Sequence, residues 1–308
     1  MIAAAVLTIA LSQASAGQDR DAVLKSAAAA MSAGRVDEAK RLLRDAGDRF
    51  GSVRALLTLA RLQSTQGDLQ GALDSIRAAR RLAPNSEDVL LAYAQVSLAA
   101  RLPVPAVLAL ESLARMSPAV AQYHYMLGVA LVTAGDMPSA SDALVRAQAL
   151  EPDRPPTLIA LGLVYTQQKR YDEAKAALAR SLELDPENPE ARAVLAEAEA
   201  GLDDVPAAER DATRVLSTAP GNARANFVLG MVRMTEQRYA DARDALLAAS
   251  SADPGSAKID YQLSLAYSRL GDQASAQRHL DLYQQKLRAT EAALKAQHDA
   301  GFGAGGRQ

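Results

Sequence analysis

Apolar residues recur at helical spacing in a unit that is clearest between Pro155 and Asn188. Its first half carries an apolar or small residue every three or four positions, which gives one apolar stripe on a helix: Leu158, Leu161, Gly162 and Tyr165. The stripe stops over residues 167–170, and a second helix opens at Tyr171. Because proline disfavours a helical conformation in the residue before it, Asp185-Pro186 ends this second helix. The pattern predicts two antiparallel helices joined by a short turn.

The same unit recurs every 34 residues, and four series of positions share that period. The prolines that close the units are Pro84, Pro118, Pro152, Pro186, Pro220 and Pro254. An alanine recurs in phase from Ala72 to Ala276, and a large apolar residue recurs from Leu59 to Leu263, each followed by Ala, Gly or Ser. We expect these small residues where the two helices of a unit cross, since a bulky side chain there would push the helices apart.

The arrangement of Leu158, Leu161-Gly162, Tyr165, Ala174, Leu178 and Pro186 closely resembles the tetratricopeptide signature. The resemblance implies an all-α, right-handed superhelical solenoid of tandem 34-residue helix-turn-helix repeats. A two-helix unit cannot bury its apolar face alone, so neighbouring units stack. The solenoid is expected over residues 17–290, in units at about 20–52, 53–86, 87–120, 121–154, 155–188, 189–222, 223–256 and 257–290, of which the first is degenerate.

Two units depart from the pattern. The unit at 87–120 has no glycine in its inner turn, and we expect Pro103 and Pro105 in the first turn of its second helix. The unit at 189–222 carries Arg192 and Glu199 where apolar residues are expected. Burying either charge without a partner is costly, so both are expected to be exposed or paired. We therefore predict that 189–222 is the softest joint of the solenoid.

The two ends of the chain differ from the repeats. Residues 3–11 are apolar and precede Ala14-Ser15-Ala16, which indicates a signal peptide over 1–16 and a periplasmic or secreted protein. No Lys or Arg precedes this run, so a cytoplasmic protein whose first helix starts there is the alternative. The run is too short to span a bilayer. Residues 291–308 are expected to hold the end of a polar capping helix, which runs to about His298, and a disordered glycine-rich tail.

Composition argues against several classes of function. A formal net charge of −2 disfavours a nucleic-acid binder. The chain has no cysteine, hence no disulfide or thiolate nucleophile. The glycine match at Gly301, Gly303 and Gly306 follows a helix rather than a strand, so it does not indicate a dinucleotide site. The three histidines lie on different units, and no catalytic motif is present. We expect no enzyme activity, cofactor, metal or small-molecule substrate.

In the resembling family, the first helix of each unit lines a concave surface that receives a peptide or helix. The residues that this implies here, at the fifth and ninth positions of the units, are Leu57, Arg61, Leu91, Gln95, Tyr125, Val129, Ile159, Leu163, Phe227, Met231, Tyr261 and Leu265, with Ala193 and Glu197 in the divergent unit. Tyr125, Phe227 and Tyr261 are the expected aromatic anchors. The alternative is that these side chains only pack between neighbouring helices.

The sequence therefore favours a non-catalytic scaffold or adaptor that binds a protein or peptide partner. A structural or self-associating component of a cell-envelope assembly is the second hypothesis.

Overall fold

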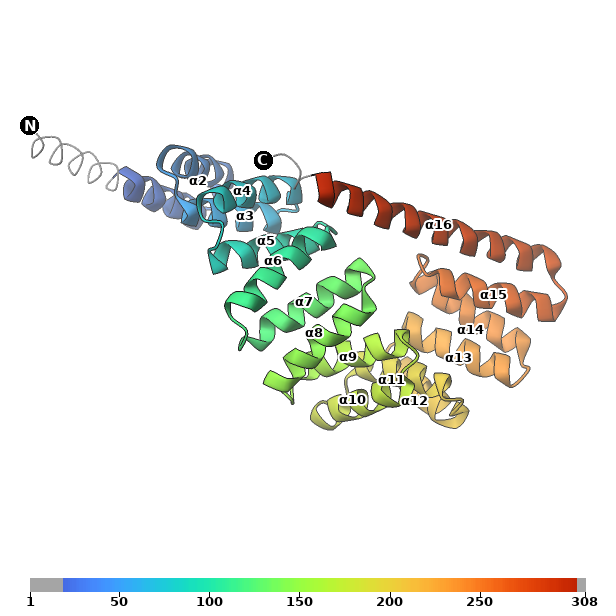
Figure 1. The fold of residues 1–308 in the computed structure, drawn as a ribbon. Coiled ribbons are helices and arrows are strands. Elements are labelled where there is room, and N and C mark those ends of the chain that lie inside the picture. The colour runs from blue at the N-terminus through green and yellow to red at the C-terminus, as the bar shows by residue number, and fades with distance from the viewer. Residues whose placement is uncertain (1–18, 304–308) are drawn as a thin grey trace, which may run out of the picture. The chain divides into compact units, whose positions relative to one another are not determined.

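The computed structural model describes residues 19–303 and, of these, the side chains of residues 19–293. Every regular element in that part of the chain is a helix (Figure 1). Contacts along the chain divide the helices into two compact units, one that ends at Pro118 and one that begins at Ala119.

The first unit holds a helix over residues 19–32, α2 (Val36–Phe50), α3 (Val53–Thr65), α4 (Leu69–Leu82), α5 (Glu87–Ala99) and α6 (Pro103–Met116). The second unit holds α7 (Ala121–Ala134), α8 (Met137–Leu150), α9 (Pro155–Gln167), α10 (Tyr171–Leu184), α11 (Pro189–Gly201), α12 (Val205–Thr218), α13 (Ala223–Thr235), α14 (Tyr239–Ala252), α15 (Ala257–Leu270) and α16 (Gln273–Gly303). Each sequence repeat is one helix pair, so the predicted all-α fold of tandem helix pairs is confirmed.

Small residues allow the two helices of a pair to approach closely. A Cβ atom on Gly162 of α9 would lie 2.4 Å from Cγ of Leu178 on α10. The equivalent atoms on Gly128 and Gly230 would lie 2.5 Å from the leucines that face them. Cβ atoms essentially never lie within 3.0 Å of such an atom, so the leucine would have to shift to admit a side chain. The expected reason for the small residues is therefore correct, and it can be stated more narrowly: each glycine makes room for one leucine.

The inner turn of every pair requires a left-handed backbone. Gly67, Gly135 and Gly271 supply it at φ 79°, 83° and 83°. Gly34 does the same in the first repeat, at φ 71°, while the remaining four repeats have positive φ without glycine: Arg101 56°, Lys169 60°, Asp203 59° and Gln237 61°. A non-glycine residue pays roughly 1 kcal/mol for this conformation. The helix pair therefore imposes the turn whether or not the sequence marks it.

The first turns of the second helices follow expectation. In α6, Pro103 is the first helical residue, where its missing N–H removes no hydrogen bond. Asp68 and Asp136 accept hydrogen bonds from the backbone N–H groups of Gly71 and Ser139, and so cap α4 and α8.

At the two ends, the predicted signal peptide (1–16) and residues 304–308 lie outside the described residues. Helix α16 continues to Gly303, beyond the predicted end near His298. Across residues 19–303, no helix is both long and apolar enough to cross a membrane.

Gly162→Ala should lower the unfolding free energy by about 1–3 kcal/mol, because the added methyl group overlaps Leu178 in a filled interface. The matched control is Gly221→Ala, where an added Cβ meets nothing within 4 Å. Urea unfolding followed by circular dichroism measures both. Equal midpoints for the two variants would contradict the proposed close approach.

Candidate functional site

The first helices of the N-terminal unit line two adjacent hollows. A hollow of about 700 Å³ lies along α3 and α5, and its lining contains four of the predicted groove residues: Leu57, Arg61, Leu91 and Gln95. A second hollow of about 450 Å³ lies between the 19–32 helix and α3, where Leu24 and Ala28 line it. Arg54 and Thr58 line both. The two together are named the N-terminal hollow below.

The N-terminal hollow combines apolar surface with positive charge. Leu57 and Leu91 are half-buried, while Arg61 and Gln95 are exposed. Leu57 and Leu91 therefore present part of their surface to solvent, although they also pack in the helix stack. A cleft that holds apolar side chains beside a few polar groups is the usual form of a binding site.

In the second unit, four more predicted groove residues are half-buried: Tyr125, Val129, Ile159 and Leu163. The guanidinium carbon of Arg154 lies 4.6 Å from the centroid of the Tyr125 ring, within cation–π range. One face of this expected anchor is therefore already occupied by a side chain of the same protein.

Phe227 differs from expectation. It is only 5% exposed and packs in a core cluster with Leu246 and Leu263, against which Met231 also packs. The ammonium group of Lys258 lies 4.6 Å from the centroid of its ring. Because it is buried in this cluster and Lys258 lies over its ring, Phe227 is a core residue here and not an exposed anchor.

Tyr261 and Leu265, one turn apart on α15, are 42% and 38% exposed. The Tyr261 ring lies 5.3 Å, centroid to centroid, from that of Tyr283 on α16. Of the three expected anchors, Tyr261 presents the largest free surface.

Charged side chains link three first helices of the second unit. Ala193 of α11 is buried, and one turn later Glu197 forms ion pairs with Arg224 of α13 and Lys258 of α15, the latter at 2.6 Å. Burial raises the pKa of Glu197, but the two cations outweigh burial and leave the pKa below its ordinary value. The carboxylate of Glu197 is therefore shared by two cations of the same protein, and the group keeps a net charge of +1.

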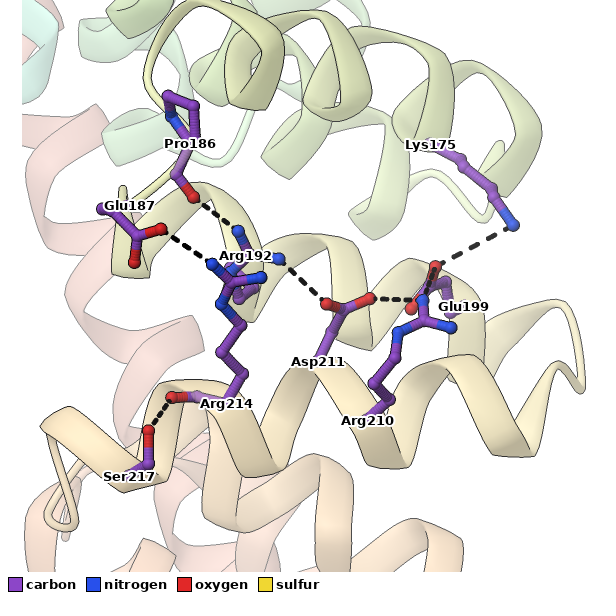
Figure 2. A network of polar contacts seen from close by, with 9 residues as sticks. All are labelled: Lys175, Pro186, Glu187, Arg192, Glu199, Arg210, Asp211, Arg214 and Ser217. Carbon is purple, nitrogen blue, oxygen red and sulfur yellow. Dashed lines mark hydrogen bonds and ion pairs between the residues drawn. The ribbon is translucent and has the colours of Figure 1, made fainter.

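The divergent unit holds a second polar network, drawn in Figure 2. Asp211 of α12, buried at 4% exposure, pairs with Arg192 at 3.0 Å and with Arg210 at 2.9 Å. Arg192 also donates a hydrogen bond to the carbonyl of Pro186. The prediction that Arg192 would be exposed or paired is confirmed.

Glu199 has weaker partners than Arg192. Its side chain is 2% exposed, and its Oε1 lies 3.9 Å from the nitrogens of Lys175 and Arg210. Within the described part of the chain, its Oε2 has no hydrogen-bond partner. Burial first, and then the neighbouring Asp211 carboxylate, raise the pKa of Glu199 to about 7, although Lys175 and Arg210 act in the opposite direction. At neutral pH this carboxyl is therefore partly protonated.

A third polar cluster, which the sequence pattern did not reveal, joins α15 to α16. His279 Nδ1 lies 2.9 Å from Oδ1 of Asp260, and Lys286 pairs with the other oxygen of that carboxylate. His279 also stacks on Tyr267 at 5.5 Å between ring centroids. The buried Asp260 of α15 thus binds two side chains of the last helix, His279 and Lys286, and holds that helix in place. Across the side chains that the structure describes, no group of three or more His, Cys, Asp or Glu could hold a metal ion.

A family model described as a tetratricopeptide repeat matches residues 24–87, 106–155 and 200–257, more than half of the chain. A second model of the same description matches residues 131–198 and 165–226. The chain belongs to the tetratricopeptide repeat family.

Solved structures of tetratricopeptide repeat proteins agree in fold. One from Parabacteroides merdae has a TM-score of 0.63 at 16% identity and covers 81% of this chain and 99% of its own. A chain from the APC/C hetero-tetramer Cut9-Hcn1 has a TM-score of 0.59 at 17% identity, covering 78% of this chain and 48% of that one. The Pseudomonas aeruginosa pilF protein has a TM-score of 0.54 at 21% identity, covering 72% and 98%. No curated protein matches the sequence.

The unfolding free energy of this tetratricopeptide repeat protein should contain a term from Glu199 that falls with rising pH. Because the pKa of about 7 in the folded state exceeds the ordinary 4.5, the folded state binds the proton more tightly. That stabilising term is fully present below about pH 4.5 and is lost as pH rises through about 7. Because Glu199→Gln stays neutral at every pH, its unfolding free energy should not fall over this range. At pH 8 the variant should therefore be more stable than wild type by on the order of 2 kcal/mol.

Urea unfolding at several pH values between 5 and 8 measures the difference. Glu187→Gln is the control, since Glu187 is an exposed carboxyl at the end of the preceding repeat, paired with Arg214 of the divergent repeat at 2.7 Å. It should keep the wild-type pH dependence. The same slope in Glu199→Gln and wild type would show that Glu199 stays ionised when buried.

Proposed function

We propose that this protein is a non-catalytic scaffold that holds a peptide or helical segment of a partner protein in the N-terminal hollow. The observation that carries the proposal is the hollow itself, in which Leu57 and Leu91 lie beside the exposed Arg61 and Gln95. Apolar surface gives such a contact its free energy, and polar groups at its rim give it orientation.

Family membership supports the proposal at a coarser level, since tetratricopeptide repeats generally mediate protein–protein interactions as scaffolds. The similar Cut9 fold is found in a hetero-tetramer. In the second unit, the half-buried Tyr125, Val129, Ile159 and Leu163, with the more exposed Tyr261 and Leu265, are proposed as contact residues of that unit in its own right.

A second candidate function is a structural or self-associating role in a cell-envelope assembly. The observation that favours it lies outside the hollow: on α6, Leu108 and Met116 are 53% and 48% exposed. Large apolar side chains so exposed on a second helix are available for contact with another copy or a neighbouring protein.

Site-specific photo-crosslinking in the native organism separates the two functions. A benzophenone side chain replaces Arg61 or Gln95 in the hollow, or Leu108 as the matched exposed control. We expect Arg61 and Gln95 to give adducts with one and the same protein, and Leu108 to give none with it, as read by mass spectrometry. Adducts of the chain with itself, strongest from Leu108, would favour self-association. Adducts from all three positions with the same proteins would contradict a specific groove.

We also propose that the chain is exported, on the strength of the signal-like sequence at residues 1–16. The protein purified from its native cell envelope should begin at Gly17 when its N-terminus is sequenced. A protein from the cytoplasm that begins at Met1 would contradict export.

A further inference from the structure

The three first helices of the N-terminal unit present the same spacing of residues to the N-terminal hollow. Each helix contributes positions at i, i+3, i+4 and i+7, so that each lines the hollow with one face. The sets are Asp21, Leu24, Lys25 and Ala28; Arg54, Leu57, Thr58 and Arg61; and Asp88, Leu91, Ala92 and Gln95. The leucine of each set is half-buried, and together Leu24, Leu57 and Leu91 form a row of apolar side chains, one from each helix.

Arg54, like Lys25 and Arg61, is a cation at the N-terminal hollow that forms no ion pair within residues 19–293. It is exposed, and within residues 19–293 its guanidinium forms no ion pair, hydrogen bond or ring contact. It also lies in the first turn of α3, which has no acidic residue there. A cation at this end of a helix opposes the helix dipole. The local structure therefore gains nothing electrostatic from Arg54.

In the second unit, the cation at the position equivalent to Arg54 forms an ion pair with a carboxylate of the protein itself. Arg224 holds in α13 the place that Arg54 holds in α3, three residues before the fifth-position residue of its repeat. Its partner is Glu197, on the face of the preceding first helix, one turn beyond Ala193. Lys258 of the next repeat pairs with the same carboxylate.

In the N-terminal unit the residue that corresponds to Glu197 is an alanine. Ala28 lies one turn beyond Leu24, as Glu197 lies one turn beyond Ala193, and it is exposed at the hollow that Arg54 also lines. The ninth position of the first repeat therefore carries no charge, whereas the same position of the divergent repeat carries Glu197. Elsewhere in the hollow, Asp21 pairs with Arg20 at 3.3 Å. Asp88, one repeat beyond Arg54, lines the same hollow and forms no ion pair within residues 19–293.

We propose that the N-terminal hollow receives an acidic segment of a partner protein, one carboxylate of which pairs with Arg54 over Ala28. In this arrangement the ligand supplies the charge that Glu197 supplies to Arg224 in the second unit. A neighbouring apolar side chain of the ligand contacts the row of Leu24, Leu57 and Leu91, and Arg61 offers a second cation two turns along α3. The proposal rests on the scaffold function and adds the chemistry of the partner.

Synthetic peptides test this selectivity without knowledge of the natural partner. Three fluorescent ten-residue peptides alternate leucine with glutamate, glutamine or lysine, and anisotropy measures their binding to the full chain at low and at higher salt. We expect the glutamate peptide to bind about tenfold more tightly than the glutamine peptide, the size expected for a charge-assisted pair, and the lysine peptide to bind most weakly. The preference for glutamate should shrink at higher salt.

Two variants that leave the core untouched locate the effect. Arg54→Gln removes the cation, and Ala28→Glu supplies an internal carboxylate as Glu197 does for Arg224; both should abolish the preference for glutamate. Arg77→Gln, an exposed arginine of the second helix α4 paired with Asp74 at 3.2 Å, is the control and should keep it. Thermal unfolding of each variant checks that the fold is unchanged.

Equal affinity for the glutamate and glutamine peptides, or a preference that persists in both Arg54→Gln and Ala28→Glu, would overturn the proposal. Absence of binding by every peptide would overturn it too. In all of these cases the crosslinking experiment still decides on the scaffold function, since Arg61 and Gln95 can contact a partner of any charge. If light scattering shows a dimer that Arg54→Gln dissociates, a second copy of this chain fills the hollow and the proposed acidic partner is wrong.

Discussion

The close approach of the two helices in each pair is the constraint on which the remaining structure depends. Where Gly162 faces Leu178, the leucine occupies the volume that a side chain on the glycine would need. The approach places the first and second helices at a fixed separation and so fixes the inner turn. It also directs the remaining side chains of the first helix toward solvent or toward the neighbouring pair. The hollow along α3 and α5 is a consequence of that distribution.

The divergent unit shows what replaces this contact. Its small residue is Ala196, and Ala212 stands where the other pairs have leucine or, at Ile76, isoleucine, so less apolar volume is buried between α11 and α12. Polar groups occupy the remainder: Asp211 is paired, and Glu199 is buried with its nearest cations 3.9 Å away. Salt-bridged interiors of this kind gain less than apolar ones because each charge must leave water. The prediction that 189–222 is the softest joint stays a prediction. The division of the chain into compact units falls at Pro118 and not within 189–222.

The fold could be predicted from the sequence because the residues that recur every 34 positions each have one steric role. Gly162 allows two helices to approach closely, and Pro186 ends a helix. The site could be predicted only in part. Position in the repeat placed Leu57 and Leu91 on the hollow, but it could not show that Phe227 is covered by Lys258, because that contact depends on a charge one repeat away. The pairing of Glu197 with Arg224, and of Asp260 with His279, was equally hidden. Ion pairs between repeats follow no period, since each needs two particular residues to coincide in space.

The left-handed turn described for Arg101, Lys169, Asp203 and Gln237 has a consequence for modularity. Since residues of such different chemistry adopt one backbone conformation, the connection inside a pair carries almost no information about which pair it belongs to. Individuality lies instead on the exposed faces of the first helices. A whole pair from this chain could thus be transplanted, duplicated or deleted at its bounding prolines with its turn unaltered, and only the interactions between successive pairs would have to be re-established.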